Sequence, residues 1–153
     1  MKVFAALALA ATMAGPAAAQ ETKAGDLLIR NPVVRSAPAA GANTAGYLTI
    51  VNGGAKPDRL LSASCACART VEVHQSHVMN GTAMMMPVAA LDIPAGGQVA
   101  FAPGGYHLMI TGLKTALAEG AVQPLTLRFQ RAGAVVVSFQ VKTRIPLQPA
   151  RPG

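Results

Sequence analysis

Short segments of apolar and β-branched residues recur along the chain at intervals of about ten residues. In segments 70–74 and 126–129, apolar and polar residues alternate with period two, which is typical of a strand that buries one face. Turns rich in Gly, Pro and Asn separate the segments, and only residues 116–121 could form a short helical turn. The predicted strands are residues 26–35, 46–52, 59–64, 70–75, 98–102, 106–111, 124–130 and 135–142. The pattern predicts an all-β domain, either an antiparallel β-sandwich or a small Greek-key barrel.

The N-terminus has the features of a signal peptide over residues 1–19. Lys2 supplies a positive charge, residues 3–15 form an apolar run, and residues 17–19 are three alanines suited to cleavage. The run is shorter than the roughly 20 residues of a membrane-spanning helix. No second long apolar stretch follows, so we expect an exported protein without stable membrane insertion. The short charged region and the alanine-rich cleavage site favour the periplasm.

Length and charge narrow the possibilities further. The chain has 153 residues, which suits one folded domain over residues 20–145, followed by a flexible Pro-rich tail over residues 146–153. The net charge of +7 comes from 13 Lys and Arg residues that form no run, and only 4% of residues are aromatic. A nucleic-acid-binding surface normally needs clustered cations and stacking aromatics, so we expect no nucleic-acid partner.

Histidines and methionines are concentrated in one part of the chain. All 3 His residues and five of the 7 Met residues lie between residues 74 and 109. In the predicted strand 106–111, His107 and Met109 are two residues apart and share a face. Imidazole and thioether ligands together suit Cu(I). The alternative is that the methionines fill the core and the histidines are structural or solvated.

The spacing of four of these residues matches a known pattern. His74, Met85, His107 and Met109 are separated by ten, twenty-one and one residues. This His-x10-Met-x21-His-x-Met arrangement resembles that of the periplasmic copper chaperones called PCuAC. The similarity covers most of residues 26–145, including the Pro-Gly-Gly-Tyr segment before His107.

The resemblance implies a cupredoxin-like β-sandwich that binds one Cu(I) through His74, Met85, His107 and Met109. It implies a chaperone, not an enzyme, that carries copper to cytochrome c oxidase assembly, chiefly to the CuA centre. The partner would be a thiol-bearing chaperone or the CuA subunit, and we expect the carrier to be a monomer. Thiolate ligands of such an acceptor could take the ion by stepwise exchange.

Other soft ligands leave alternatives open within this region. Met84 or Met86 could replace Met85 by a one-residue slip, because the three methionines are consecutive. His77 and Met79 could form an accessory site or a solvated loop. The tail over residues 146–153 has neither His nor Met, which favours a single copper site.

The two cysteines, Cys65 and Cys67, are separated by a single residue. In an oxidising compartment cysteines usually pair, so an inert disulfide is one interpretation. The others are a redox-active pair and a dithiolate entry point for copper, if the pair lies at the same end of the strand as His74.

Three other functions compete with copper carriage. A periplasmic thiol oxidoreductase would use Cys65 and Cys67, but it needs a helix N-terminus at the pair. An electron-transfer cupredoxin needs a Cys ligand beside two His, and both cysteines precede His74. A metal-free Ig-like structural domain needs none of these residues. Acid–base catalysis is not indicated, because the six carboxylates are isolated in the sequence.

Overall fold

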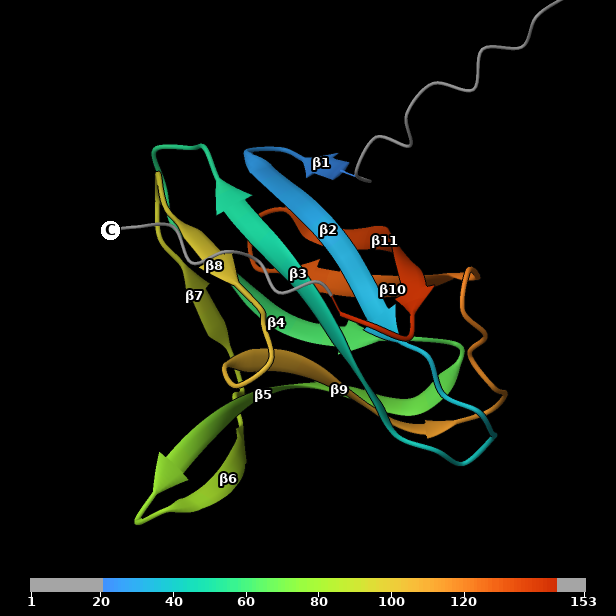
Figure 1. The fold of residues 1–153 in the computed structure, drawn as a ribbon. Coiled ribbons are helices and arrows are strands. Elements are labelled where there is room, and N and C mark those ends of the chain that lie inside the picture. The colour runs from blue at the N-terminus through green and yellow to red at the C-terminus, as the bar shows by residue number, and fades with distance from the viewer. Residues whose placement is uncertain (1–20, 146–153) are drawn as a thin grey trace, which may run out of the picture.

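The computed structural model describes residues 21–145, and their regular secondary structure consists entirely of β-strands (Figure 1). The strands are β1 (Glu21–Ala24), β2 (Leu27–Arg35), β3 (Thr44–Asn52), β4 (Asp58–Ser64), β5 (Ala68–Met79), β6 (Thr82–Pro87), β7 (Leu91–Ile93), β8 (Gln98–Ala100), β9 (Tyr106–Leu113), β10 (Val122–Phe129) and β11 (Gly133–Lys142). This confirms the predicted all-β fold class. No helix in this part of the chain is long and apolar enough to cross a membrane. The predicted signal peptide over residues 1–19 and the predicted tail over residues 146–153 lie outside the described residues.

Seven of the strands close into a barrel. They follow one another in the order β2-β11-β10-β4-β5-β9-β3, and β3 pairs back with β2. The remaining strands extend the sheet: β1 pairs with β2, β8 with β3, β7 with β4 and β6 with β5. A wholly antiparallel sheet was predicted, but β11 and β2 run parallel. The reason is geometric, since strand direction cannot alternate all the way around a ring with an odd number of strands.

The core follows from the period-two pattern. Along β11, Val135, Val137, Phe139 and Val141 are buried, and the residues between them face outward or are partly exposed. The other barrel strands supply further buried aliphatic and aromatic side chains to the same interior. Removing this apolar surface from water is the main force that closes the barrel.

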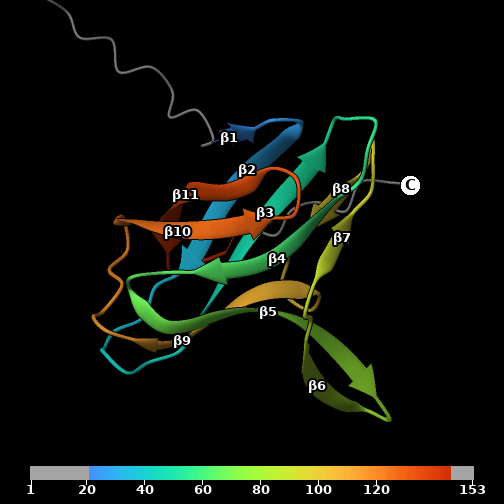
Figure 2. The same cartoon turned by 180° about the vertical axis from the view of Figure 1, so that it is seen from behind.

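A hairpin made of β5 and β6 extends past the barrel, as both views show (Figures 1 and 2). The sequence predicted only residues 70–75 of β5 and missed β6, because an exposed strand lacks the alternation that burial imposes. The strands β1 and β7, with 4 and 3 residues, were also missed. Asn80 and Gly81 form the turn, with φ of 51° and 77°. Two positive φ values are the signature of a type I′ turn, whose twist matches a two-residue hairpin.

Candidate metal centre

His74, His107 and Met109 lie on one face of the paired strands β5 and β9. His74 is directly opposite His107 in the strand register, and Glu72 is opposite Met109. The residues that alternate with these four on both strands point into the core. Three of the four predicted ligands are therefore neighbours on the outer side of the barrel wall.

The two imidazole rings are close and perpendicular. Their centroids are 5.8 Å apart and their planes meet at 87°. The His107 residue is only 4% exposed, and the His74 side chain is 17% exposed. The pair is thus largely removed from water, although it lies on the outer face of the barrel.

Hydrogen bonds use one nitrogen of each ring and leave the other nitrogen free. His74 Nε2 is 3.2 Å from a Glu72 carboxylate oxygen, and His107 Nδ1 is 3.3 Å from the Gly105 carbonyl oxygen. Because these oxygens only accept, the bonded nitrogens donate. His74 Nδ1 and His107 Nε2 are buried without a partner. An imidazole that donates through one nitrogen to a carboxylate or carbonyl presents the lone pair of the other, as metal-binding histidines do.

Burial also affects the protonation of His107. Desolvation lowers the pKa of His107 below its ordinary value of 6.5. The hydrogen bond to Gly105 opposes this shift, and the positive charge of protonated His74 adds to it. The ring is therefore neutral at neutral pH, so a metal ion need not displace a proton from it.

Met109 and Met85 flank the histidine pair on different strands. Met109 is half-buried on β9, on the same face as His107. Met85 pairs with Ser76 in the β5–β6 hairpin, and Ser76 is two residues beyond His74. Since side chains alternate along a strand, Met85 belongs to the His74 face. Its residue is 59% exposed, so Met85 stands at the solvent side of the candidate centre.

The strand register separates the three consecutive methionines. Met84 pairs with His77 and Met86 pairs with Gln75, which places both on the face opposite to that of Met85. Met84, Met85 and Met86 are 46%, 59% and 50% exposed, respectively. Core packing, the alternative considered for these methionines, is therefore wrong.

Sequence reasoning missed the part that Glu72 plays, because it treated every carboxylate as isolated. The signal was present, since a Glu two residues before a His in a strand shares its face. Within residues 21–145, no three His, Cys, Asp or Glu side chains are grouped so that they could hold a metal ion. The side chains with a further soft ligand atom that flank the histidine pair belong to methionines, Met85 and Met109.

Cys65 and Cys67 form a disulfide in the turn between β4 and β5. The disulfide adjoins the first residue of β5, Ala68, which pairs with Leu113. Ala68 is six residues before His74. At about 3.3 Å per residue, the cysteines are ~20 Å from the histidine pair. An arrangement at the same end as His74, on which a dithiolate entry point depended, is wrong. A strand follows Cys67, so the helix that a thioredoxin-like site needs is absent there.

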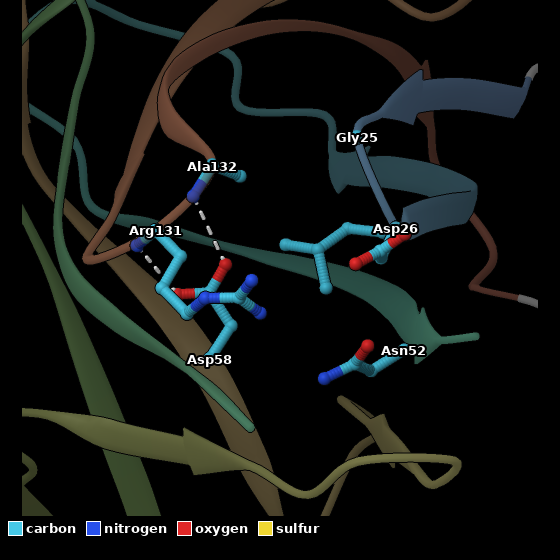
Figure 3. Close-up of a pocket in the computed structure, with 7 residues that line it drawn as sticks. Gly25, Asp26, Asn52, Asp58, Arg131 and Ala132 are labelled. Carbon is cyan, nitrogen blue, oxygen red and sulfur yellow. Dashed lines mark hydrogen bonds between the residues drawn. The ribbon is translucent and has the colours of Figure 1, made fainter. Parts of the chain in front are cut away.

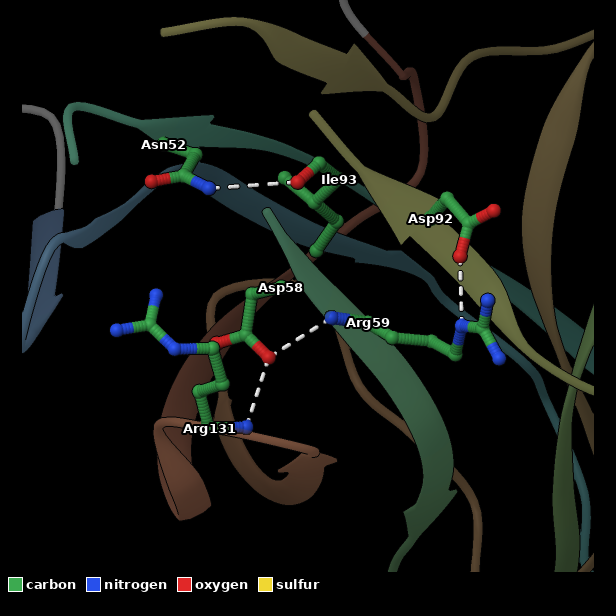
Figure 4. Close-up of polar contacts among 6 residues, drawn as sticks. All are labelled: Asn52, Asp58, Arg59, Asp92, Ile93 and Arg131. Atoms are coloured by element: carbon green, nitrogen blue, oxygen red, sulfur yellow. Dashed lines mark hydrogen bonds and ion pairs between the residues drawn. The ribbon is translucent and has the colours of Figure 1, made fainter. Parts of the chain in front are cut away.

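A pocket of about 110 Å³ lies elsewhere in the barrel and shares no strand with the histidine pair (Figure 3). One wall is Asp58, whose carboxylate accepts hydrogen bonds from backbone N–H groups of Arg59, Arg131 and Ala132 at 2.7, 2.8 and 3.1 Å (Figures 3 and 4). Asn52 in the same pocket donates to the carbonyl oxygens of Lys56 and Ile93. Through these hydrogen bonds, Asp58 and Asn52 hold neighbouring loops together.

Comparison with known families and curated proteins gives two matches. Residues 27–141 match the family described as "Putative lipoprotein LpqE-like". "Putative lipoprotein Lxx21020" from Leifsonia xyli subsp. xyli (strain CTCB07) is 33% identical over 106 residues, which are 68% of this chain and 64% of that protein. The chain thus matches just under two thirds of the length of this relative.

Solved structures with the same fold include copper-bound proteins. The "Copper-bound PCuAC domain from PmoF2" has a TM-score of 0.68 and 28% identity, covering 82% of this chain and 99% of that domain. Apo-DR1885 from Deinococcus radiodurans has a TM-score of 0.62 and 27% identity, covering 95% and 97% of the two chains. The CuI form of DR1885 has a TM-score of 0.57 and 28% identity, covering 74% and 78%. These matches confirm the cupredoxin-like fold of the PCuAC type.

Proposed function

Since this chain belongs to the LpqE-like family, we propose that it is an exported copper chaperone that binds one Cu(I) tightly and releases it to a partner. The ligands are His74 Nδ1, His107 Nε2 and the thioether sulfurs of Met109 and Met85. One observation carries the proposal: two opposed imidazoles whose lone-pair nitrogens are both buried and unpartnered. A buried polar atom without a partner is costly, and a metal ion supplies the missing interaction.

The ligand set suits a carrier of Cu(I). Two imidazoles and two thioethers are neutral, soft enough for Cu(I), and contain no thiolate. Thioethers do not compete with protons, so half of the ligands are independent of pH. The chain acts by binding and release, and we propose no catalytic step.

Release begins at the exposed side of the site. Met85 lies on a projecting hairpin and is more than half exposed, whereas His107 is buried in the barrel wall. A thiolate of the acceptor replaces Met85 first, and the histidines leave the ion last. We propose the periplasm as the compartment and a protein of cytochrome c oxidase assembly, chiefly of its CuA centre, as the acceptor. The predicted signal peptide supports export, as do the family and the relative that are described as putative lipoproteins.

An anaerobic titration with Cu(I) against a chromophoric Cu(I) chelator tests the binding step. The chain from residue 20 onward should bind one Cu(I) tightly, and Met85→Ala should weaken that binding at least tenfold. Met84→Ala is the matched control, because Met84 is adjacent and similarly exposed but belongs to the other face. Unchanged tight binding in Met85→Ala, or its loss in Met84→Ala, would contradict the proposed ligand set.

Transfer is tested separately with copper-loaded protein and the soluble CuA domain of an oxidase. When the two proteins are mixed in equimolar amounts, copper should move to the cysteines of the CuA domain. After oxidation of the mixture, the absorption bands of the CuA centre measure how much copper has moved. Retention of copper by the carrier at equimolar acceptor would refute this partner while leaving the binding site intact.

A further inference from the structure

A second group of soft ligands lies on the opposite face of the β5–β6 hairpin. We call it the hairpin cluster, and its members are His77, Met79, Met84 and Met86. They alternate with the residues of the His74 face, so they share the other face. None of them belongs to the ligand set proposed above.

The strand register places His77 and Met84 at the middle of the cluster, with Met86 on one side of them along the hairpin and Met79 on the other. His77 and Met84 are directly opposite each other, a relation that places Cβ atoms about 4.5–5.5 Å apart. Met86 is two residues beyond Met84 on β6, and Met79 is two residues beyond His77 on β5. Met86 is therefore a diagonal neighbour of His77, and Met79 is one of Met84, at about 7–8 Å, which a long thioether side chain can bridge. Met79 and Met86 are four residues apart along the hairpin, ~13 Å, so an ion bound by His77 and Met84 takes one of these two sulfurs and not both.

Core packing does not account for the cluster. Its face continues the core-facing side of β5, but the hairpin has already left the barrel there. Met79, Met84 and Met86 are 56%, 46% and 50% exposed. A soluble domain rarely exposes so many large apolar side chains together unless they bind something. His77 interrupts the apolar face, and its side chain has no hydrogen-bond or ion-pair partner among residues 21–145.

The stretch of chain that contains the hairpin has no positively charged side chain that would repel a bound cation. Residues 70–113 contain none of the 13 Lys and Arg residues of the chain, and their charged residues are Glu72 and Asp92. A monovalent cation therefore meets no fixed positive charge along this stretch, although the whole chain carries +7.

We propose that the hairpin cluster is a second Cu(I) site, weaker and more exposed than the one at His74 and His107. His77, Met84 and one of the two outer methionines supply one imidazole and two thioethers, a neutral, soft ligand set that favours Cu(I) over harder divalent ions. His77 is three residues from His74, so the two sites are ~10 Å apart along the strand. The second site holds copper at the tip of the hairpin, where ions enter from or leave to solvent and partners. Since the two sites share no ligand, this proposal stands or fails separately from the first.

Anaerobic Cu(I) titration of matched variants tests the second site. The unaltered chain should bind two Cu(I), the second at least tenfold more weakly than the first. His77→Ala/Met84→Ala should lose the weaker equivalent and keep the tight one, and His107→Ala should do the reverse. Val78→Ala, a highly exposed change on the same hairpin that removes no ligand, should keep both.

Three titration results would overturn the proposal: a single equivalent in the unaltered chain, a second equivalent that survives in His77→Ala/Met84→Ala, or loss of both equivalents in His107→Ala. NMR of the methionine methyl groups in the unaltered chain gives a readout independent of variant folding. Met85 and Met109 should shift with the first equivalent, and Met84 together with either Met86 or Met79 should shift with the second. Simultaneous shifts of Met84, Met85 and Met109 would show one shared site and refute the inference.

Discussion

Two buried polar centres of this barrel differ in how their hydrogen-bonding capacity is used. Asp58 is 5% exposed, and its carboxylate accepts three backbone N–H groups from β4 and the β10–β11 turn. His107 is similarly buried at 4%, yet its Nε2 has no partner, and neither has Nδ1 of His74 opposite. One centre is complete within the chain and the other is not.

The difference distinguishes a structural group from a ligand. A buried polar group with partners contributes to stability, whereas one without them costs about 1–3 kcal/mol. At the histidine pair, the burial of the apolar core offsets the free-energy cost of the two unpaired nitrogens. An incomplete centre is ready to bind a cation, and a complete one only joins loops.

The largest expected effect is on stability at Asp58. Asp58→Ala leaves three backbone N–H groups without their acceptor and should lower the free energy of unfolding by about 3 kcal/mol. Chemical denaturation measures this, and copper affinity of the folded variant should be unchanged. Asp92→Ala is the control: its carboxylate is 73% exposed and paired only with Arg59, so the loss should be below about 1 kcal/mol. Equal losses in both variants would remove the contrast between the centres.

Glu72 sharpens the comparison because it is a positioning residue that acts through His74. Glu72→Ala removes the acceptor of His74 Nε2 and should weaken Cu(I) binding about tenfold, with Glu72→Gln intermediate. Chelator competition measures the affinity, and nitrogen NMR of the His74 ring should show a changed proton position. An unchanged ring spectrum together with unchanged affinity would mean that Glu72 plays no part.

The pH dependence of the metal-free protein follows from the lowered pKa of His107. In the unfolded chain the His107 side chain takes up a proton near pH 6.5, whereas in the folded chain it does so only at a lower pH. The neutral His107 ring therefore makes its full contribution to the free energy of unfolding above pH 6.5. This contribution decreases as the pH falls from 6.5 toward and through the pKa that His107 has in the folded protein. Denaturation midpoints between pH 8 and pH 5 should fall less steeply for His107→Ala. The same slope in both proteins would contradict the lowered pKa.

The smallest expected effect is at the disulfide. Cys65→Ser/Cys67→Ser should leave the tight Cu(I) affinity within twofold, because the pair is ~20 Å from His74. Chelator competition again decides. Loss of tight binding would mean that thiolates reach the copper after all.

Local patterns predicted much of the barrel but little of the hairpin. The alternation in β5, β10 and β11 was visible because each strand buries one face against the core. The hairpin turn was visible at Asn80 and Gly81, whose residue types suit positive φ. The strand β6 was not, because its six residues are all exposed and no burial imposes a pattern on them.

The sequence by itself determined which ligand types are present, their spacing and the predominance of short strands. These are local properties, since residue type and side-chain period do not depend on distant segments. Tertiary structure alone decided that His74 is opposite His107, which nitrogens remain free, that Met85 and Met84 occupy different faces, and that the cysteines are at the far end of β5. Those properties depend on strand register and burial, which only the closing of the whole barrel fixes.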